Sequence, residues 1–121
     1  MADVGSAVFH YLPEQVKGNT VGMRFTVRTP THDPKDLTGA TIRWVLKTYD
    51  KATQVLDESS AGVTVGIESP PTAGLLTISM ASIATTALTD SLYYDELEVT
   101  DGNASVYTTA YGYIPFRDSE V

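Results

Sequence analysis

Apolar and polar residues alternate along several short segments of the chain. The clearest alternation covers residues 21–28, 40–47, 63–68 and 75–80. Successive side chains of a β-strand point to opposite faces, so this period of two predicts strands with one buried face. The apolar positions predict a core made of Met23, Phe25, Val27, Ile42, Trp44, Leu46, Val65, Ile67, Leu76, Ile78 and Val99.

Turn-forming residues separate further elements. Residues 92–100 and 105–116 flank Asp101-Gly102-Asn103 and predict a hairpin. Shorter strands are expected within 8–12 and 53–56, and one helical turn within 81–91. We therefore expect an all-β fold: a single Ig-like β-sandwich domain over residues 1–121, with seven to eight mostly antiparallel strands and short flexible termini.

One strand of the expected hairpin breaks the alternation. In "LYYDELEV", Asp95 has the same parity as Tyr93, Leu97 and Val99. Either Asp95 is buried with a partner, or a β-bulge shifts the register between Tyr94 and Leu97. We favour the bulge, because burying an unpaired charge is costly. "DSLYY" is also similar to the tyrosine corner of immunoglobulin sandwiches, which favours an inward Tyr94.

The second hairpin strand carries a row of tyrosines. Tyr107, Tyr111 and Tyr113 share one parity, while small and apolar residues occupy the other. The apolar face supplies the core contacts, so we expect the three tyrosines to face outward. Tyrosines in a hairpin also stabilise sheets by covering a neighbouring strand. The alternative is a protein interface, because tyrosine combines a large apolar area with a polar tip.

Composition and charge narrow the function classes. The hydrophobic content of 42% suffices for a core, and the net charge of -7 disfavours nucleic acid as a partner. There are no cysteines, which is typical of a reducing compartment. The N-terminal residues have no signal-peptide pattern, and no segment has the roughly 20 apolar residues of a membrane span. We expect neither export nor membrane association.

Candidate catalytic and metal-binding residues are few. A GxSxG nucleophile motif is absent, and His32 beside Asp33 is the one histidine–carboxylate pair adjacent in sequence. A solvent-exposed loop histidine explains that pair more simply. Acidic residues cluster toward the C-terminus, but strand alternation would separate them and the spacing differs from an EF-hand. They are Asp95, Glu96, Glu98 and Asp101. We therefore expect no enzyme activity, no metal and no cofactor.

Several phrases of the sequence resemble a known family. "VKGNTVGMRFTVRT", "DLTGATIRWVLKT", "GLLTISM", "LYYDELEVTDGN" and "TTAYGYIPF" occur in that order between residues 16 and 116. This order resembles the N-terminal Ig-like domain of phage baseplate upper proteins and related small tailed-phage virion proteins. The chain departs from the family at Asp95-Glu96 and at Tyr113-Ile114-Pro115, and the resemblance implies that it corresponds to the Ig-like unit alone.

The resemblance implies a structural subunit of a tailed-bacteriophage virion, in the tail, baseplate, neck or head decoration. Such a protein is assembled in the host cytoplasm and contacts other virion proteins in multiple copies. Tyr107, Tyr111 and Tyr113 are the expected interface residues. The alternative is a carbohydrate-binding module of a phage adhesin, because aromatic rows on β-sandwiches also stack on sugar rings.

Overall fold

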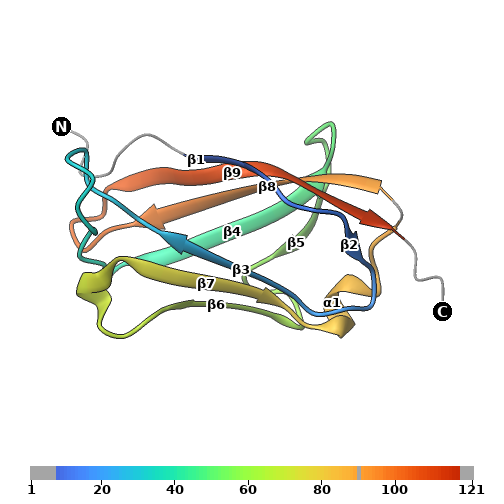
Figure 1. Cartoon of the computed structure of the whole chain (residues 1–121), viewed down its shortest axis with the longest axis horizontal. Helices are drawn as coiled ribbons and strands as arrows, with labels where there is room; N and C mark the ends of the chain where they lie inside the picture. Colours follow the sequence, from blue (N-terminus) through green and yellow to red (C-terminus); the bar gives the residue numbers. More distant parts are fainter. Residues whose placement is uncertain (1–7, 90, 118–121) are drawn as a thin grey trace.

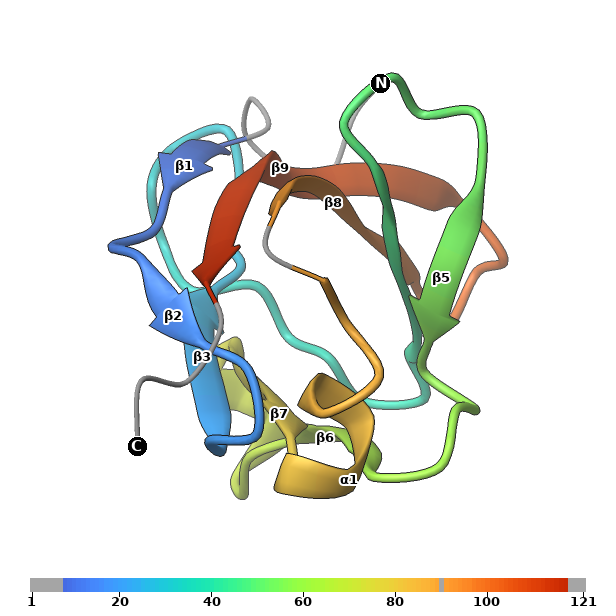
Figure 2. The same ribbon diagram turned by 90° about the vertical axis from the view of Figure 1, so that its right-hand side faces the viewer.

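The computed structural model describes residues 8–89 and 91–117, and their regular secondary structure consists almost entirely of two packed β-sheets (Figures 1 and 2). The strands are β1 (Val8–Tyr11), β2 (Gln15–Val16), β3 (Val21–Thr26), β4 (Thr41–Thr48), β5 (Gln54–Asp57), β6 (Val63–Ile67), β7 (Leu75–Met80), β8 (Ser91–Thr100) and β9 (Val106–Arg117). Two short helical segments complete the fold, η1 (Pro71–Ala73) and α1 (Ser82–Thr85).

The larger sheet, sheet A, has the strand order β1-β9-β8-β4-β5, and β2 also pairs with β9. The smaller sheet, sheet B, has the order β3-β7-β6. Within these sheets β1 and β2 run parallel to β9, and the other pairs are antiparallel. Figure 2 shows the two layers end on, with β1 and β2 along one side and β5 at the opposite edge of sheet A.

The all-β, two-sheet prediction is confirmed. The described residues form nine strands instead of seven or eight, because the N-terminal segment pairs with β9 twice. Pro13 lies between the two pairings and has no backbone N–H to donate to a ladder. The chain therefore leaves β9 after Tyr11 and rejoins it at Gln15.

The core lies between the two sheets and contains every residue predicted for it. Trp44, Leu46, Leu76 and Ile78 are fully buried at its centre. Of the remaining predicted residues, three are also buried and four pack against the core while partly buried. The buried ones are Met23, Val27 and Val99, and the partly buried ones are Phe25, Ile42, Val65 and Ile67.

A β-bulge changes the face of one predicted interface tyrosine. Leu97 pairs with Ala110 and Glu98 pairs with Thr108, so Thr109 is the extra residue on β9. An extra residue reverses the parity of everything before it. Tyr107 consequently packs against the core, and the prediction that it shares a face with Tyr111 and Tyr113 is wrong.

The bulge favoured for β8 between Tyr94 and Leu97 is also wrong. The pairing of β8 with β4 runs without a shift from Tyr93 to Thr100. The inward tyrosine is therefore Tyr93 and not Tyr94, and its hydroxyl accepts a hydrogen bond from the backbone N–H of Thr89 at 2.9 Å. The unbroken register also carries Asp95 into the core.

The position of Trp44 generates a stability prediction. The Trp44→Ala variant should lose about 3–5 kcal/mol of unfolding free energy, because truncating a buried aromatic side chain leaves a cavity. Val106 on β9 is 59% exposed and offers a control, with a change within about 0.5 kcal/mol expected for Val106→Ala. Urea unfolding measures both, and a loss below about 1 kcal/mol for Trp44→Ala would contradict the burial of the ring.

Candidate functional site

A buried carboxylate organises the inner face of sheet A. Asp95 is fully buried, and both of its oxygens have partners. His10 Nε2 donates to Oδ1 at 2.6 Å, and Trp44 Nε1 donates to Oδ2 at 3.1 Å. The three residues come from β1, β4 and β8, so one side chain ties together three strands. The alternative of a buried, partnered Asp95 is the one that the structure adopts.

Gly112 makes this contact possible. In the sheet register, Gly112 of β9 lies between Asp95 of β8 and His10 of β1. A Cβ atom at Gly112 would overlap the carbonyl oxygen and the ring of His10. Because glycine leaves that space open, the His10 side chain reaches across β9 to the carboxylate of Asp95.

The same contact places two aromatic residues on the outside of the protein. His10 points inward, where its ring lies 5.5 Å from the ring of Phe25 in sheet B. Phe9 and Tyr11 flank His10 in β1 and therefore point outward, where they are 52% and 61% exposed. The buried pair thus fixes the position of an exposed part of the surface.

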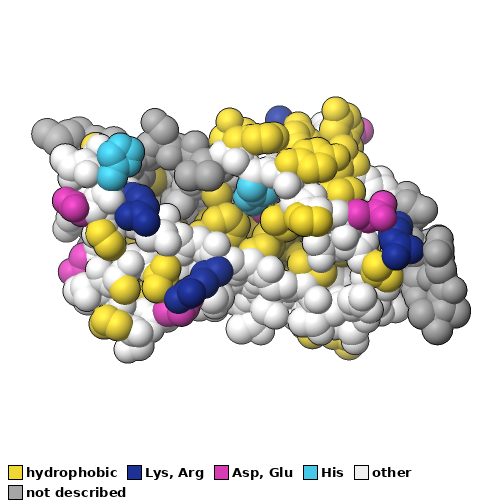
Figure 3. All heavy atoms as spheres, viewed as in Figure 1, with side chains coloured by type: hydrophobic (Ala, Val, Ile, Leu, Met, Phe, Trp, Pro, Cys, Tyr) yellow, Lys and Arg dark blue, Asp and Glu magenta, His cyan; other side chains and the backbone are white. Residues whose placement is uncertain are grey.

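Six aromatic side chains form a cluster on the outer face of sheet A. We call Phe9, Tyr11, Tyr49, Tyr94, Tyr111 and Tyr113 the aromatic cluster. Tyr113 is at its centre, with ring centroids 5.4 Å from Tyr49 and 5.6 Å from Tyr94. Figure 3 shows hydrophobic side chains gathering over this side of the molecule, along β1, β9 and the turn between β4 and β5.

Tyr94 fixes the inner edge of the aromatic cluster. It is buried, its hydroxyl donates to Glu96 Oε2 at 2.9 Å, and Lys51 Nζ lies 4.5 Å from the ring centroid. Burial, followed by the hydrogen bond to Glu96, raises the pKa of the Tyr94 phenol well above its ordinary value. The side chain is therefore a neutral hydrogen-bond donor throughout the physiological pH range.

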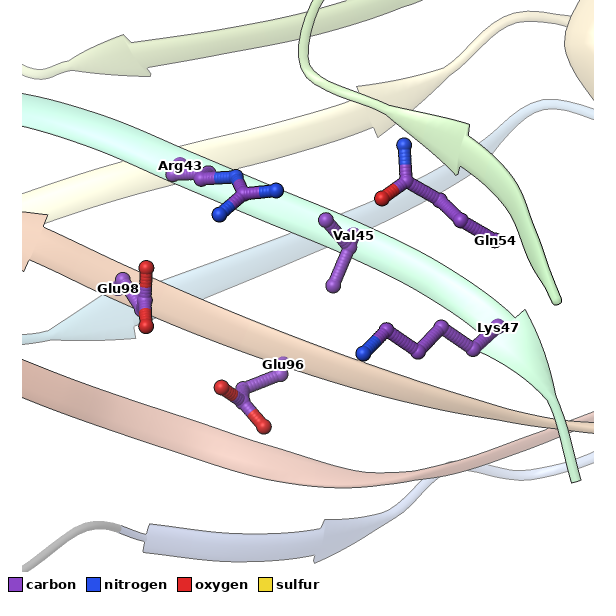
Figure 4. Close-up of a pocket in the computed structure, with 6 residues that line it drawn as sticks. All are labelled: Arg43, Val45, Lys47, Gln54, Glu96 and Glu98. Atoms are coloured by element: carbon purple, nitrogen blue, oxygen red, sulfur yellow. The ribbon is translucent and has the colours of Figure 1, made fainter. Parts of the chain in front are cut away.

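A strip of charged residues continues the outer face beyond the aromatic cluster. Arg43 and Lys47 project from β4, and Glu96 and Glu98 project from the neighbouring β8. We call these four residues the charged strip. With Val45 and Gln54 they line a shallow depression, in which the basic side chains lie along one strand and the acidic side chains along the next (Figure 4).

The residues singled out for catalysis or metal binding do not assemble into a site. His32 and Asp33 lie in an exposed loop, where the His32 carbonyl accepts a hydrogen bond from Arg28. Strand alternation points Asp95 inward and Glu96 and Glu98 outward. Over residues 8–89 and 91–117, no three His, Asp or Glu side chains are grouped to hold a metal ion.

A histidine–carboxylate pair does form between His10 and Asp95, whose side chains are 14% and 0% exposed. Both side chains lie on the inner face of sheet A, and the second oxygen of the carboxylate accepts a hydrogen bond from the indole of Trp44.

Among the described residues, no helix has the length and apolar character needed to cross a membrane.

Part of the aromatic cluster was predicted from the sequence. Tyr111 and Tyr113 lie on the outer face as expected, and Tyr107 does not. Phe9, Tyr11 and Tyr49 were missed, although they are the most exposed members. Alternation around His10 in "VFHY" contained the signal for the first two, and Tyr49 lies in a turn whose direction the sequence does not specify.

The buried pair generates a double-mutant prediction. His10→Ala should lower the unfolding free energy by about 3–5 kcal/mol, because it leaves Oδ1 of the buried Asp95 without its hydrogen-bond partner. Adding Asp95→Asn should recover part of that loss, giving a coupling energy of about 1 kcal/mol or more. His32→Asn is a matched control, because asparagine tolerates the positive φ of that residue. Additive losses in urea unfolding would show that the pair is not coupled.

No protein-family model matches this chain, and no curated protein matches it significantly. The resemblance to phage Ig-like domains therefore stays a prediction from the sequence phrases. The strongest local indication of function is the outer face of sheet A, where an exposed aromatic cluster adjoins a strip of charged residues.

Proposed function

We propose that this chain is a structural protein that binds other proteins through the outer face of sheet A, as a subunit of a tailed-phage virion. The observation that carries the proposal is the aromatic cluster around Tyr113, three of whose members are more than half exposed. Contiguous exposed apolar area of this kind marks interaction sites on soluble proteins. Tyrosines and an adjoining polar strip match the usual composition of a protein interface.

The orientation of the rings favours a protein partner over a carbohydrate. Sugar rings stack on exposed aromatic faces, which requires flat and accessible rings. In the aromatic cluster, Tyr113 meets Tyr94 at 63° and Phe9 at 65° between ring planes. Tyr11 and Tyr49 are tilted against Tyr113 at 47° and 38°. The rings therefore do not form one flat platform, and the uneven surface suits interdigitating side chains.

The Ig-like classification belongs to the same proposal and has two supports. The β3-β7-β6 sheet faces a sheet that contains β4, β8 and β9, which is the strand grouping of immunoglobulin sandwiches. Tyr93 near the start of β8 bonds the backbone of Thr89, four residues upstream, in the manner of a tyrosine corner. The virion setting rests on the sequence phrases that resemble phage Ig-like domains.

Purified particles of the phage that encodes the chain test this proposal. We expect mass spectrometry to find the chain in stoichiometric amounts, and a cryo-EM map to show the aromatic cluster covered by protein. A Tyr11→Ser, Tyr49→Ser variant should incorporate at least about tenfold less well, because interface energy concentrates in aromatic anchors. The matched control is Val106→Ser, since Val106 and Tyr49 are both 59% exposed.

Absence of the chain from the particles would contradict the virion role. Incorporation of the double variant at the wild-type level, with its fold retained by circular dichroism, would contradict the role of the aromatic cluster. Binding of soluble glycans that the Tyr11→Ser, Tyr49→Ser variant loses would replace the proposal with the carbohydrate-binding alternative.

A further inference from the structure

We infer that the outer face of sheet A pairs with the same face of a second copy of this chain. The pairing has a two-fold axis that runs parallel to the strands, between β4 and β8. This inference rests on the proposed function in using the same face, and it specifies the partner. It is carried by the arrangement of charges in the charged strip.

Opposite charges occupy neighbouring strands in the strip. Arg43 of β4 is directly across from Glu98 of β8, and Val45 is across from Glu96. Lys47 follows at the next outward position of β4, beside Tyr94. One strand therefore presents two positive charges and its neighbour two negative charges. Arg43 and Glu98 lie at the same height along the strands, whereas Glu96 lies across from the position two residues before Lys47.

Three of these four charged side chains have no ion-pair partner within the described part of the chain. Among the described residues, Arg43, Lys47 and Glu98 make no ion pair within 4.0 Å. Glu96 accepts a hydrogen bond from the Tyr94 hydroxyl, which uses one of its two oxygens. The strip thus keeps its capacity for charged contacts with another molecule.

A two-fold axis parallel to the strands makes this pattern complementary to itself. Rotation about an axis between β4 and β8 brings β4 of one copy over β8 of the other, at the same height along the strands. Arg43 of each copy then meets Glu98 of the other copy, and Lys47 approaches Glu96. Such an isologous contact is the commonest arrangement of soluble homodimers.

The strip is also where two acidic chains can approach each other. The chain carries a net charge of -7, so two copies repel over most of their surfaces. The charged strip holds two basic and two acidic residues and is neutral. The same rotation brings β9 of each copy over β5 of the other, so the two aromatic clusters lie on opposite sides of the axis and flank the paired strips.

Charge-reversal variants test the inference by sedimentation equilibrium of the purified chain. We expect the wild type to form a concentration-dependent dimer. Arg43→Glu alone and Glu98→Arg alone should each weaken self-association at least about tenfold, because like charges then face each other across the axis. An equimolar mixture of the two variants should associate within about threefold of the wild type, since every cross-axis contact is again between opposite charges.

The mixture separates pairing between copies from effects inside one chain. Each variant keeps its own altered strip in the mixture, so a loss of folding stability in either one would persist. The inference is overturned by a wild type that stays monomeric, by a dimer that both single variants retain, or by a mixture that fails to associate. A monomeric wild type whose aromatic variants still fail to enter particles would leave the proposed function standing with a different partner.

Discussion

The burial of Asp95 is the constraint on which much of the remaining structure depends. A carboxylate inside a core is tolerated only when hydrogen-bond partners compensate for its lost hydration. His10 and Trp44 supply those partners, and Gly112 supplies the space through which His10 reaches the carboxylate. The N-terminal strand therefore has a polar anchor in addition to its parallel pairing with β9.

Because side chains alternate along a strand, the inward contacts of Asp95 also determine which residues lie on the outer face of sheet A. Each inward residue of β1 and β9 that serves the buried pair has outward neighbours, and these neighbours belong to the aromatic cluster. Phe9 and Tyr11 flank His10, while Tyr111 and Tyr113 flank Gly112. The exposed cluster and the hydrogen bond between His10 and Asp95 thus depend on one register, so a slip of β1 by one residue would disrupt both.

The sequence was sufficient for the parts of the fold that depend on local pattern. The core positions of β3, β4 and β7 follow from alternation, because one face of each strand is apolar over its length. The contact between His10 and Asp95 could not be predicted from the sequence, because the two residues are 85 positions apart. It depends on the parallel pairing of β1 with β9, and no turn motif in the sequence indicates that pairing. The bulge at Thr109 was equally hidden, because threonine suits either face and tyrosines occur on both sides of it.

Contacts within the chain hold several members of the aromatic cluster in place, and this bears on the binding proposed for this face. Exposed aromatic side chains normally lose rotamer freedom on association, at a cost of roughly 0.5–1.5 kcal/mol for each flexible side chain. Here Tyr113 packs against the rings of Tyr49 and Tyr94. Tyr94 is held in turn by its hydrogen bond to Glu96 and by Lys51, whose ammonium group lies over its ring. Tyr113 and Tyr94 are therefore positioned by contacts within the chain. A face built in this way combines a small ordering cost with a defined shape, and both properties favour repeated, identical contacts over adaptable ones.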